Sequence, residues 1–413
     1  MKIVFLVLSW LIAGAGAPGR LHQMPDGTHI PALTAEQWRE DLHYLAAELP
    51  RRHRDPFHHT SKAAFEAAVT ELDARIPTSQ PWEIVVGLQQ LAAMPGDGHT
   101  FVATWGVYQH FPLEVFRYAD GWRVVRAAAA YRDVLGLRLR GIGGKSMPEV
   151  ERRLRALVPQ GENRWFVWQN MAGNLTRAEP LAARGVLPAV GPAAFEFEGE
   201  DGSRFVRTIA PLPPGTLTDR VDAYPTALFR QRPEEALPFM LLADGKTVYA
   251  NFRSYDDHER QARRLLAFLN ETGARRLILD LRGNGGGNYT LPRKHLIAPL
   301  QFHPTLNRAG RLYVLIGRGT FSAAMTNATD FRRETEAILV GEPTGARPNG
   351  YQELYSFSLP HSRLTVCCAI LRYRFQEGKA DAVHPDWRIE PNARALREGD
   401  DPVIRRILSE PIP

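Results

Sequence analysis

Two short apolar runs in the second half of the chain each end in a glycine-rich turn. The run Arg276–Leu281 is followed by Gly-Asn-Gly-Gly-Gly at 283–287, and the run Leu312–Ile316 is followed by Gly-Arg-Gly-Thr-Phe-Ser-Ala-Ala at 317–324. Such runs, with little polar alternation, are typical of strands buried on both faces. Glycines placed after a strand let the backbone adopt positive φ angles and expose N–H groups that can bind a developing oxyanion.

Ser322 lies in the second turn, directly before an expected helix at Ala323–Arg333. A serine between a strand and a helix has an exposed hydroxyl near the positive end of the helix dipole, which suits a nucleophile. The same position also suits a serine that only caps the helix. The glycine cluster at 283–287 is not followed by Gly-Lys-Ser/Thr, which argues against a phosphate loop, and its spacing only weakly fits a dinucleotide fingerprint. We therefore expect no cofactor.

His99 is the best candidate for a general base, since histidine most often has that role. It lies in Pro95–Thr104, where Gly96 and Gly98 bracket Asp97 and a strand is expected from about Thr100. A turn histidine that only bonds to the backbone is the alternative. Another group, His53, His58 and His59, lies in a loop without a Cys or carboxylate at helical spacing, which favours a capped loop over a metal site.

In their order along the chain, these motifs resemble those of the S41 serine peptidases, the family of tail-specific or C-terminal processing proteases. The resemblance rests on Asp280-Leu-Arg-Gly-Asn-Gly-Gly-Gly, Thr320-Phe-Ser-Ala-Ala, Val340-Gly-Glu-Pro-Thr-Gly, Asp97-Gly-His-Thr and Val383-His-Pro-Asp. It covers the chain from about Thr34 to Asn392. It implies an α/β fold with a crotonase-like (ClpP/crotonase-type) catalytic domain, an N-terminal helical domain and a PDZ-like β-rich insert.

The resemblance also implies roles for individual residues. Ser322 would be the nucleophile and His99 the base, with Asp381 as the first candidate for the carboxylate that orients His99 and Asp97 as the second. The oxyanion hole would consist of the backbone N–H groups of Gly285, Gly286 and Ala323.

Many S41 peptidases carry a lysine base in the segment after the nucleophile. The matching stretch here, 341–349, has no lysine, so the chain resembles the tricorn-like branch of the family. Arg347 occupies this stretch and cannot act as a base, because it stays protonated. Its planar fork suits a carboxylate, so we expect it to pair with Glu342 or Glu353 or to bind a substrate carboxylate. A solvent-exposed loop arginine is the alternative.

The expected domain organisation follows from composition and pattern. Residues 1–17 have a lysine, an apolar core and a small-residue Ala-Gly-Ala end, which is typical of a secretory signal peptide, with an uncleaved anchor as the alternative. Residues 31–104 should form the helical domain, 105–215 the PDZ-like domain and 216–413 the S41 catalytic domain. Expected helices at Thr34–Pro50, Ser61–Ile76 and Trp82–Met94 would make up the first of these.

Composition restricts the partners. The chain has 413 residues, a net charge of +6 and 44% hydrophobic residues, which is an ordinary globular composition. The basic residues are spread along the chain without a run of like charge, so nucleic acid is not an expected partner. With the leader removed, no integral membrane span is expected, and the two adjacent cysteines give no disulfide framework. We expect an exported, periplasmic or extracellular protein that acts on a peptide or protein substrate.

Two hypotheses remain open at this point. The first is a serine-type peptidase that uses Ser322 and a backbone oxyanion hole. The second is a catalytically inactive protein of the same fold that binds a peptide or an apolar ligand. The distance between the Ser322 hydroxyl and a ring nitrogen of His99 separates them, because a base must lie within hydrogen-bond reach of the proton that it removes.

Overall fold

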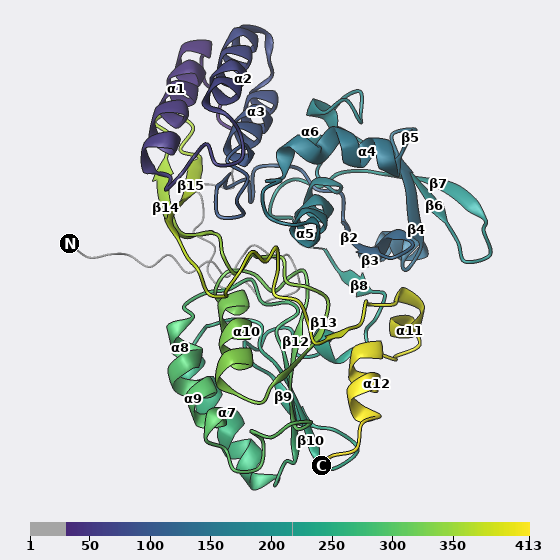
Figure 1. Ribbon diagram of the computed structural model, residues 1–413. Coiled ribbons are helices and arrows are strands. Elements are labelled where there is room, and N and C mark those ends of the chain that lie inside the picture. Colours follow the sequence, from purple (N-terminus) through teal and green to yellow (C-terminus); the bar gives the residue numbers. More distant parts are fainter. Residues whose placement is uncertain (1–29, 217) are drawn as a thin grey trace.

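A computed structural model describes residues 30–216 and 218–413, and Figure 1 shows their arrangement. The chain forms three regions, each built around its own sheet or helix group. The predicted signal peptide, residues 1–17, lies outside the described residues. Within the described ranges, no helix combines the length and apolar character needed to cross a membrane.

The first region begins with the three helices that the sequence predicts: α1 (Ala35–Arg52), α2 (Lys62–Arg75) and α3 (Pro81–Ala93). Thr34 caps α1 in a capping box with Gln37, and the Ser61 hydroxyl caps α2. A two-residue strand, β1 (Phe101–Val102), follows the loop that carries His99.

A late hairpin joins this first region. Strands β14 (Tyr351–Ser358) and β15 (Thr365–Arg372) pair with each other, and β15 also pairs antiparallel with β1. In Figure 1 the hairpin lies beside α1, and the buried Asp41 carboxylate accepts the backbone N–H groups of His361 and Ser362. The helical region is therefore not formed by 31–104 alone, because residues 351–372 complete it. Cys367 and Cys368 lie on β15 as buried free thiols.

The second region contains a seven-stranded antiparallel sheet with main order β2-β3-β4-β6-β7. The sheet begins with the hairpin that the sequence predicts, in which the first strand ends at Tyr118 and the second begins at Gly121, the glycine of the predicted Asp-Gly turn. Helix α5, which the sequence pattern does not predict, packs against β2. The elements are β2 (Leu113–Tyr118), β3 (Gly121–Ala128), β4 (Arg138–Ile142), β5 (Lys145–Ser146), α4 (Met147–Leu154), α5 (Arg164–Asn174), α6 (Ala178–Ala183), β6 (Ala193–Glu198), β7 (Arg204–Ile209) and β8 (Arg220–Asp222).

The third region contains a six-stranded sheet in the order β16-β13-β12-β11-β10-β9, parallel except at the β9 edge. Parallel strands of this kind are buried on both faces and need helices on each side. Figure 1 shows α7, α9 and α10 on one side and α12 on the other. The elements are β9 (Phe239–Leu241), β10 (Thr247–Asn251), α7 (His258–Glu271), β11 (Arg276–Asp280), α8 (Thr290–Pro292), α9 (Ala298–Gln301), β12 (Leu312–Ile316), α10 (Ala323–Glu334), β13 (Ile338–Gly341), β16 (Trp387–Arg388), α11 (Ala393–Arg397) and α12 (Pro402–Leu408).

The two predicted strand-to-turn units are adjacent strands of this sheet. β11 and β12 pair in parallel, with Leu279 opposite Val314 and Asp280 opposite Leu315. Because the strands run the same way, both glycine-rich turns emerge at the same, carboxyl edge. Ligands bind at that edge in open α/β sheets, so the topology brings the two turns together where a site is expected.

Candidate active site

Ser322 lies in a strained turn between β12 and α10. Its backbone has φ 49° and ψ −125°, a combination that costs a non-glycine residue about 1–3 kcal/mol. Its side chain makes no capping bond to α10, although the residue occupies the N-cap position. The geometry is therefore that of a nucleophile elbow and not that of a capping serine.

The Ser322 hydroxyl bonds to His99. The distance between Ser322 Oγ and His99 Nε2 is 3.0 Å, within reach of direct proton transfer. The His99 ring is buried and stacks on Phe321, the residue before the serine, with ring centroids 4.8 Å apart. The structure thus joins two residues that the sequence separates by more than half of its length.

Burial sets the protonation state of His99. It lowers the pKa of the imidazole to about 4, against the opposing influence of the Asp97 charge and of the Tyr351 backbone. His99 is consequently neutral at pH 7, the form that accepts a proton. Its Nδ1 atom is buried and, among the described residues, has no partner of full hydrogen-bond geometry.

The structure does not bring Asp381 to His99, which corrects the expected orienting carboxylate. Asp381 Oδ1 lies 2.8 Å from His384 Nε2 in a pair that is half exposed. The Asp381 backbone carbonyl accepts a bond from the Asn163 side chain at 2.8 Å. This bond holds the backbone at Asp381 in place, and the Asp381 carboxylate lies in the half-exposed pair with His384.

Asp97, the second candidate, supports His99 through the backbone. Its Oδ1 accepts the His99 N–H and the Thr100 hydroxyl, both at 3.0 Å, and its Oδ2 lies 2.8 Å from Nε2 of the buried His53. His53 Nδ1 accepts the backbone N–H of Asp55, so in the neutral ring Nε2 is the nitrogen that donates to Asp97. Asp97 therefore organises the turn that holds His99, and its side chain pairs with a different histidine.

The expected oxyanion donors surround the serine. A Cβ atom on Gly286, whose φ is +109°, would lie 2.7 Å from Ser322 Cβ and 2.9 Å from the Ala323 nitrogen. Only glycine fits this approach of the first turn to the second. The Gly286 N–H donates to the Asn284 side chain at 2.9 Å. Gly285 is buried next to it, and Ala323 begins α10, where N–H groups lack intrahelical partners.

Further bonds hold the two turns together. The Thr320 hydroxyl donates to the Leu281 carbonyl at 2.8 Å, and the Phe321 N–H donates to the Asn284 carbonyl at 3.0 Å. The Asn284 side chain donates to the Phe252 carbonyl at 2.8 Å. The position of Ser322 relative to the glycine cluster is therefore determined by direct bonds between the turns.

Arg347 contacts neither of the expected glutamates. Its guanidinium donates to the Glu162 backbone carbonyl from Nε at 3.0 Å and from Nη2 at 2.8 Å, while Glu342 pairs with Arg318. This corrects the expected pairing with Glu342 or Glu353, and these two bonds give Arg347 a structural role that links its loop to the start of α5.

Glu162 and Asn163 are the site residues that the sequence analysis missed. The buried Glu162 carboxylate accepts the Gly98 N–H at 3.1 Å and the Arg347 N–H at 3.2 Å. Burial raises its pKa to about 7, and the Asp97 charge adds to this effect. Asn163 caps α5 and bonds to the Thr344, Gly345 and Asp381 carbonyls. The only sequence signal was Asn163 before an apolar stretch, which is typical of an N-cap.

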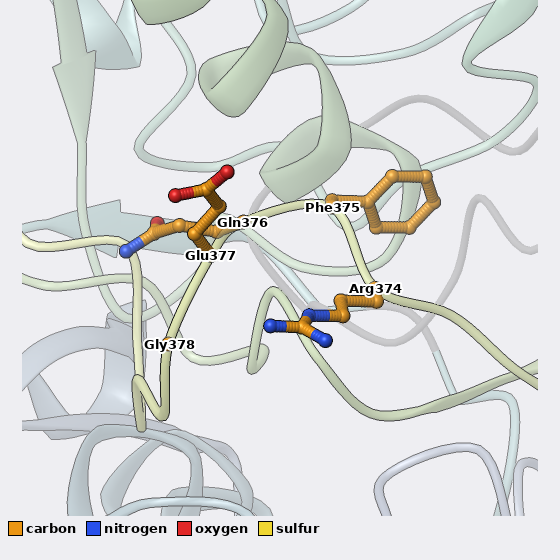
Figure 2. A pocket seen from close by; sticks show the side chains of 5 residues that line it. All are labelled: Arg374, Phe375, Gln376, Glu377 and Gly378. Carbon is orange, nitrogen blue, oxygen red and sulfur yellow. The ribbon is translucent and has the colours of Figure 1, made fainter.

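No metal cluster is present within residues 30–216 and 218–413, where no three His, Cys, Asp or Glu side chains are placed to hold an ion. A pocket of about 480 Å³ lies against the loop 374–378, which follows β15. Figure 2 shows the Arg374, Phe375, Gln376 and Glu377 side chains pointing in different directions, so no polar groups converge there. The bonded pair of Ser322 and His99 thus remains the strongest candidate site.

The fold is similar to that of solved structures. Mature CPAF is 13% identical, with a TM-score of 0.59 over 91% of this chain and 96% of that one. The photosystem II D1 C-terminal processing protease matches at 13% identity and a TM-score of 0.43, over 89% of this chain and 97% of that one. A putative S41 protease from Bacteroides fragilis matches at 12% identity and a TM-score of 0.39, over 92% of this chain and 97% of that one. The chain therefore shares its fold with mature CPAF.

By contrast, no protein-family model matches the sequence, and no similar sequence was found among curated proteins. At these identities the likeness to solved structures defines the fold alone.

Proposed function

We propose that this protein is a serine-type peptidase of the S41 type, and that it hydrolyses peptide bonds with Ser322 as nucleophile and His99 as general base. The observation that carries the proposal is the 3.0 Å contact between Ser322 Oγ and His99 Nε2 in a strained elbow. In this scheme the third region is the crotonase-like catalytic domain. Residues 105–215 are the PDZ-like insert, and the leader-like residues 1–17 direct export.

The proposed reaction follows the general chemistry of serine hydrolases. His99 Nε2 takes the hydroxyl proton as Ser322 Oγ attacks the substrate carbonyl carbon, and the carbonyl oxygen gains the negative charge. Backbone N–H groups of Gly285, Gly286 and Ala323 stabilise that oxyanion. Because Gly286 donates to Asn284, its N–H must leave this acceptor or share it. His99 then protonates the leaving amine, and water hydrolyses the acyl-enzyme by the same steps.

A second candidate is an inactive protein of the same fold that binds a peptide or an apolar ligand. One observation favours it: no carboxylate of the described residues bonds to His99 Nδ1, the atom that a triad acid would orient. The 3.0 Å hydrogen bond between His99 and Ser322 favours the peptidase.

Labelling of the protein with a fluorophosphonate probe, followed by peptide mapping, separates the two candidates. The peptidase predicts one labelled residue, Ser322, and the hydrolysis of a peptide library. Ser322→Ala should abolish labelling and reduce kcat/KM by several orders of magnitude, with the fold intact by circular dichroism. Turnover retained by Ser322→Ala, or no labelling of the unmodified protein, would refute the peptidase assignment.

A further inference from the structure

A cavity of about 610 Å³ lies between the second and third regions. Its lining includes the turns that follow three adjacent parallel strands: residues 282–283 after β11, 317–319 after β12 and 341–342 at the end of β13. The opposite wall comes from β2, β3 and α5. Cavities of this size, at a domain interface and at the carboxyl edge of a parallel sheet, are typical ligand sites.

The cavity adjoins the Ser322–His99 pair through aromatic rings. Phe166 lines it and lies 5.4 Å from Phe321, whose ring in turn stacks on His99. Gly98, also in the lining, packs against both phenylalanines, since a Cβ there would lie 2.6 Å from each ring. A chain bound in the cavity would therefore be separated from the catalytic pair by the rings of Phe166 and Phe321.

Arginines outnumber acidic residues in the cavity wall. Seven arginines line it against three acidic residues, Glu114, Glu342 and Asp401. Four of the arginines already have carboxylate partners in the protein, and these pairs are Arg220–Glu114, Arg230–Asp222, Arg282–Asp280 and Arg318–Glu342. A fifth, Arg253, donates to backbone carbonyls, including that of Phe229 at 3.0 Å.

Arg117 and Arg177 differ from the other five. Within the described ranges, neither forms a salt bridge, and neither makes the several carbonyl bonds of Arg253. Arg117 donates only to the Tyr118 carbonyl, at 3.3 Å, and its buried Nε has no partner. Its guanidinium lies 5.0 Å from the Trp168 ring, which also lines the cavity. Arginine held flat against an aromatic ring keeps its outer N–H groups available for a planar anion.

Arg177 likewise has only weak side-chain contacts among the described residues. It donates to the Thr104 hydroxyl at 3.3 Å and lies 6.0 Å from the Tyr108 ring. Burial lowers its pKa, although the charges of Tyr108 and Glu179 oppose the shift. A partly buried guanidinium without a full counter-charge binds an anion favourably, because the anion offsets part of the cost of that burial.

We propose that this cavity binds an acidic peptide segment of the substrate, and that Arg117 and Arg177 receive the carboxylates of its Asp or Glu side chains. This proposal rests on the proposed peptidase function, since the bound segment is a substrate only if the protein is a peptidase. Aromatic side chains of the wall, Phe116, Trp168 and Tyr224 among them, would pack against the apolar parts of the segment. Specificity for acidic sequences would thus come from two arginines that form no salt bridge with a carboxylate of the described residues.

Binding to the Ser322→Ala protein tests this without any catalysis. Fluorescein-labelled peptides Ala-Glu-Phe-Glu-Leu and Ala-Gln-Phe-Gln-Leu, each as free acid and as C-terminal amide, are titrated and followed by anisotropy. We expect the Glu peptides to bind about tenfold more tightly than the Gln peptides, in both the acid and the amide form. Equal affinities, or a difference set only by acid against amide, would overturn the side-chain assignment.

Substitutions of the two arginines test whether they cause the preference for Glu over Gln peptides. Arg117→Met and Arg177→Met should each reduce the Glu-over-Gln preference severalfold. Arg117→Lys should retain part of it, because the charge stays but the planar fork is lost. Arg152→Met, an exposed position on α4, is the matched control and should leave the preference unchanged. A preference unaltered in both cavity variants would refute the proposal.

If the methionine variants do not fold, the parent protein supplies an independent measurement. The Glu-over-Gln ratio should fall as NaCl is raised, because salt screens the contact, and a salt-independent ratio would overturn the proposal. Fluorophosphonate labelling reports the peptidase assignment separately. Labelling without an acidic preference refutes only the cavity proposal, whereas an acidic preference without labelling refutes only the peptidase proposal.

Discussion

The two sides of the candidate active site are built in different ways. The sheet side, with Ser322 and the glycine cluster, comes from turns after two neighbouring strands that bond directly to each other. The helical side brings His99 by contacts that are distant in sequence: β1 pairs with β15, and Glu162 holds the Gly98 N–H. Ser322 is therefore positioned by local geometry, whereas the position of His99 depends on the assembly of several regions.

The largest expected effect concerns the two buried histidines of the helical side. His99→Gln should reduce kcat/KM by about 10²–10⁴-fold, the usual contribution of a general base. His53→Gln should have a smaller effect, because His53 contacts Asp97 and not the serine. Both variants are compared by steady-state kinetics at pH 7 after their thermal unfolding has been checked.

An equal loss in both variants, with native stability, would show that His53 is as important to the chemistry as His99. This result would contradict the proposal that His99 acts on the serine and that His53 acts only through Asp97. Asp381→Asn is a useful third variant, since Asp381 pairs with His384 and should change the rate little.

Substitution within the glycine cluster tests the sheet side. Gly286→Ala should lower kcat by about 10²–10³-fold, comparable to the loss of an oxyanion donor. The reason is steric: the new Cβ would meet Ser322 and Ala323, and the φ of +109° is strained for alanine. Gly350→Ala, which does not line the cavity, is the matched control, because its new Cβ would lie at an ordinary contact distance of 3.6 Å from Arg347 Cβ and its φ lies outside the left-handed region.

A similar kcat for the two alanine variants would show that the close approach of the turns does not position the nucleophile. A fall in fluorophosphonate labelling in Gly286→Ala alone would place the defect at the serine itself.

The acid limb of the pH profile tests the protonation state of the base. A folded-state pKa of about 4, below the usual 6.5, means that His99 stays neutral until the pH falls close to 4. The limb of kcat/KM should have its midpoint near 4, not at the ~6–7 of an unperturbed imidazole. Between pH 6.5 and pH 4 the unfolded state binds more protons than the folded state because of this shift. The free energy of unfolding therefore also decreases as the pH is lowered through this range. Intrinsic fluorescence at each pH separates the two effects, and a midpoint near 6.5 in folded protein would contradict the buried base.

The sequence predicted the sheet side better than the helical side for a physical reason. The strand-to-turn units at 276–287 and 312–324 are continuous segments, so apolar runs and glycines reveal both the strands and the turns that follow them. The partners of His99 are not continuous. Asp381 lay at a suitable place in the sequence, but the Asn163 bond to its carbonyl and its contact with His384 direct it elsewhere.

Contacts between distant parts of the chain also determine the surroundings of Arg347 and Glu162. An arginine in a loop can contact any carboxylate or carbonyl that the fold brings near, and here the partner is a residue of the second region. Helix α5, which begins just after Glu162, has mixed aromatic and polar residues without a clear apolar face. It was not predicted, and Glu162 was missed with it.

The smallest expected effect concerns Glu162, and it is measured as stability. Its folded-state pKa of about 7 lies above the unfolded value of 4.5, mainly because of burial. The folded protein therefore holds this proton between pH 4.5 and 7, and the associated stability is lost as the pH rises through 7.

Glu162→Gln keeps the size of the side chain and removes the titration. Relative to this variant, the parent should lose on the order of 3 kcal/mol of unfolding free energy between pH 4.5 and pH 8. Urea unfolding of both proteins at the two pH values measures the change, and because His99 and Asp97 are present in both, their contributions cancel. A parent-minus-variant difference that is the same at both pH values would mean that Glu162 ionises normally, and that burial does not perturb the carboxylate that holds the turn of His99.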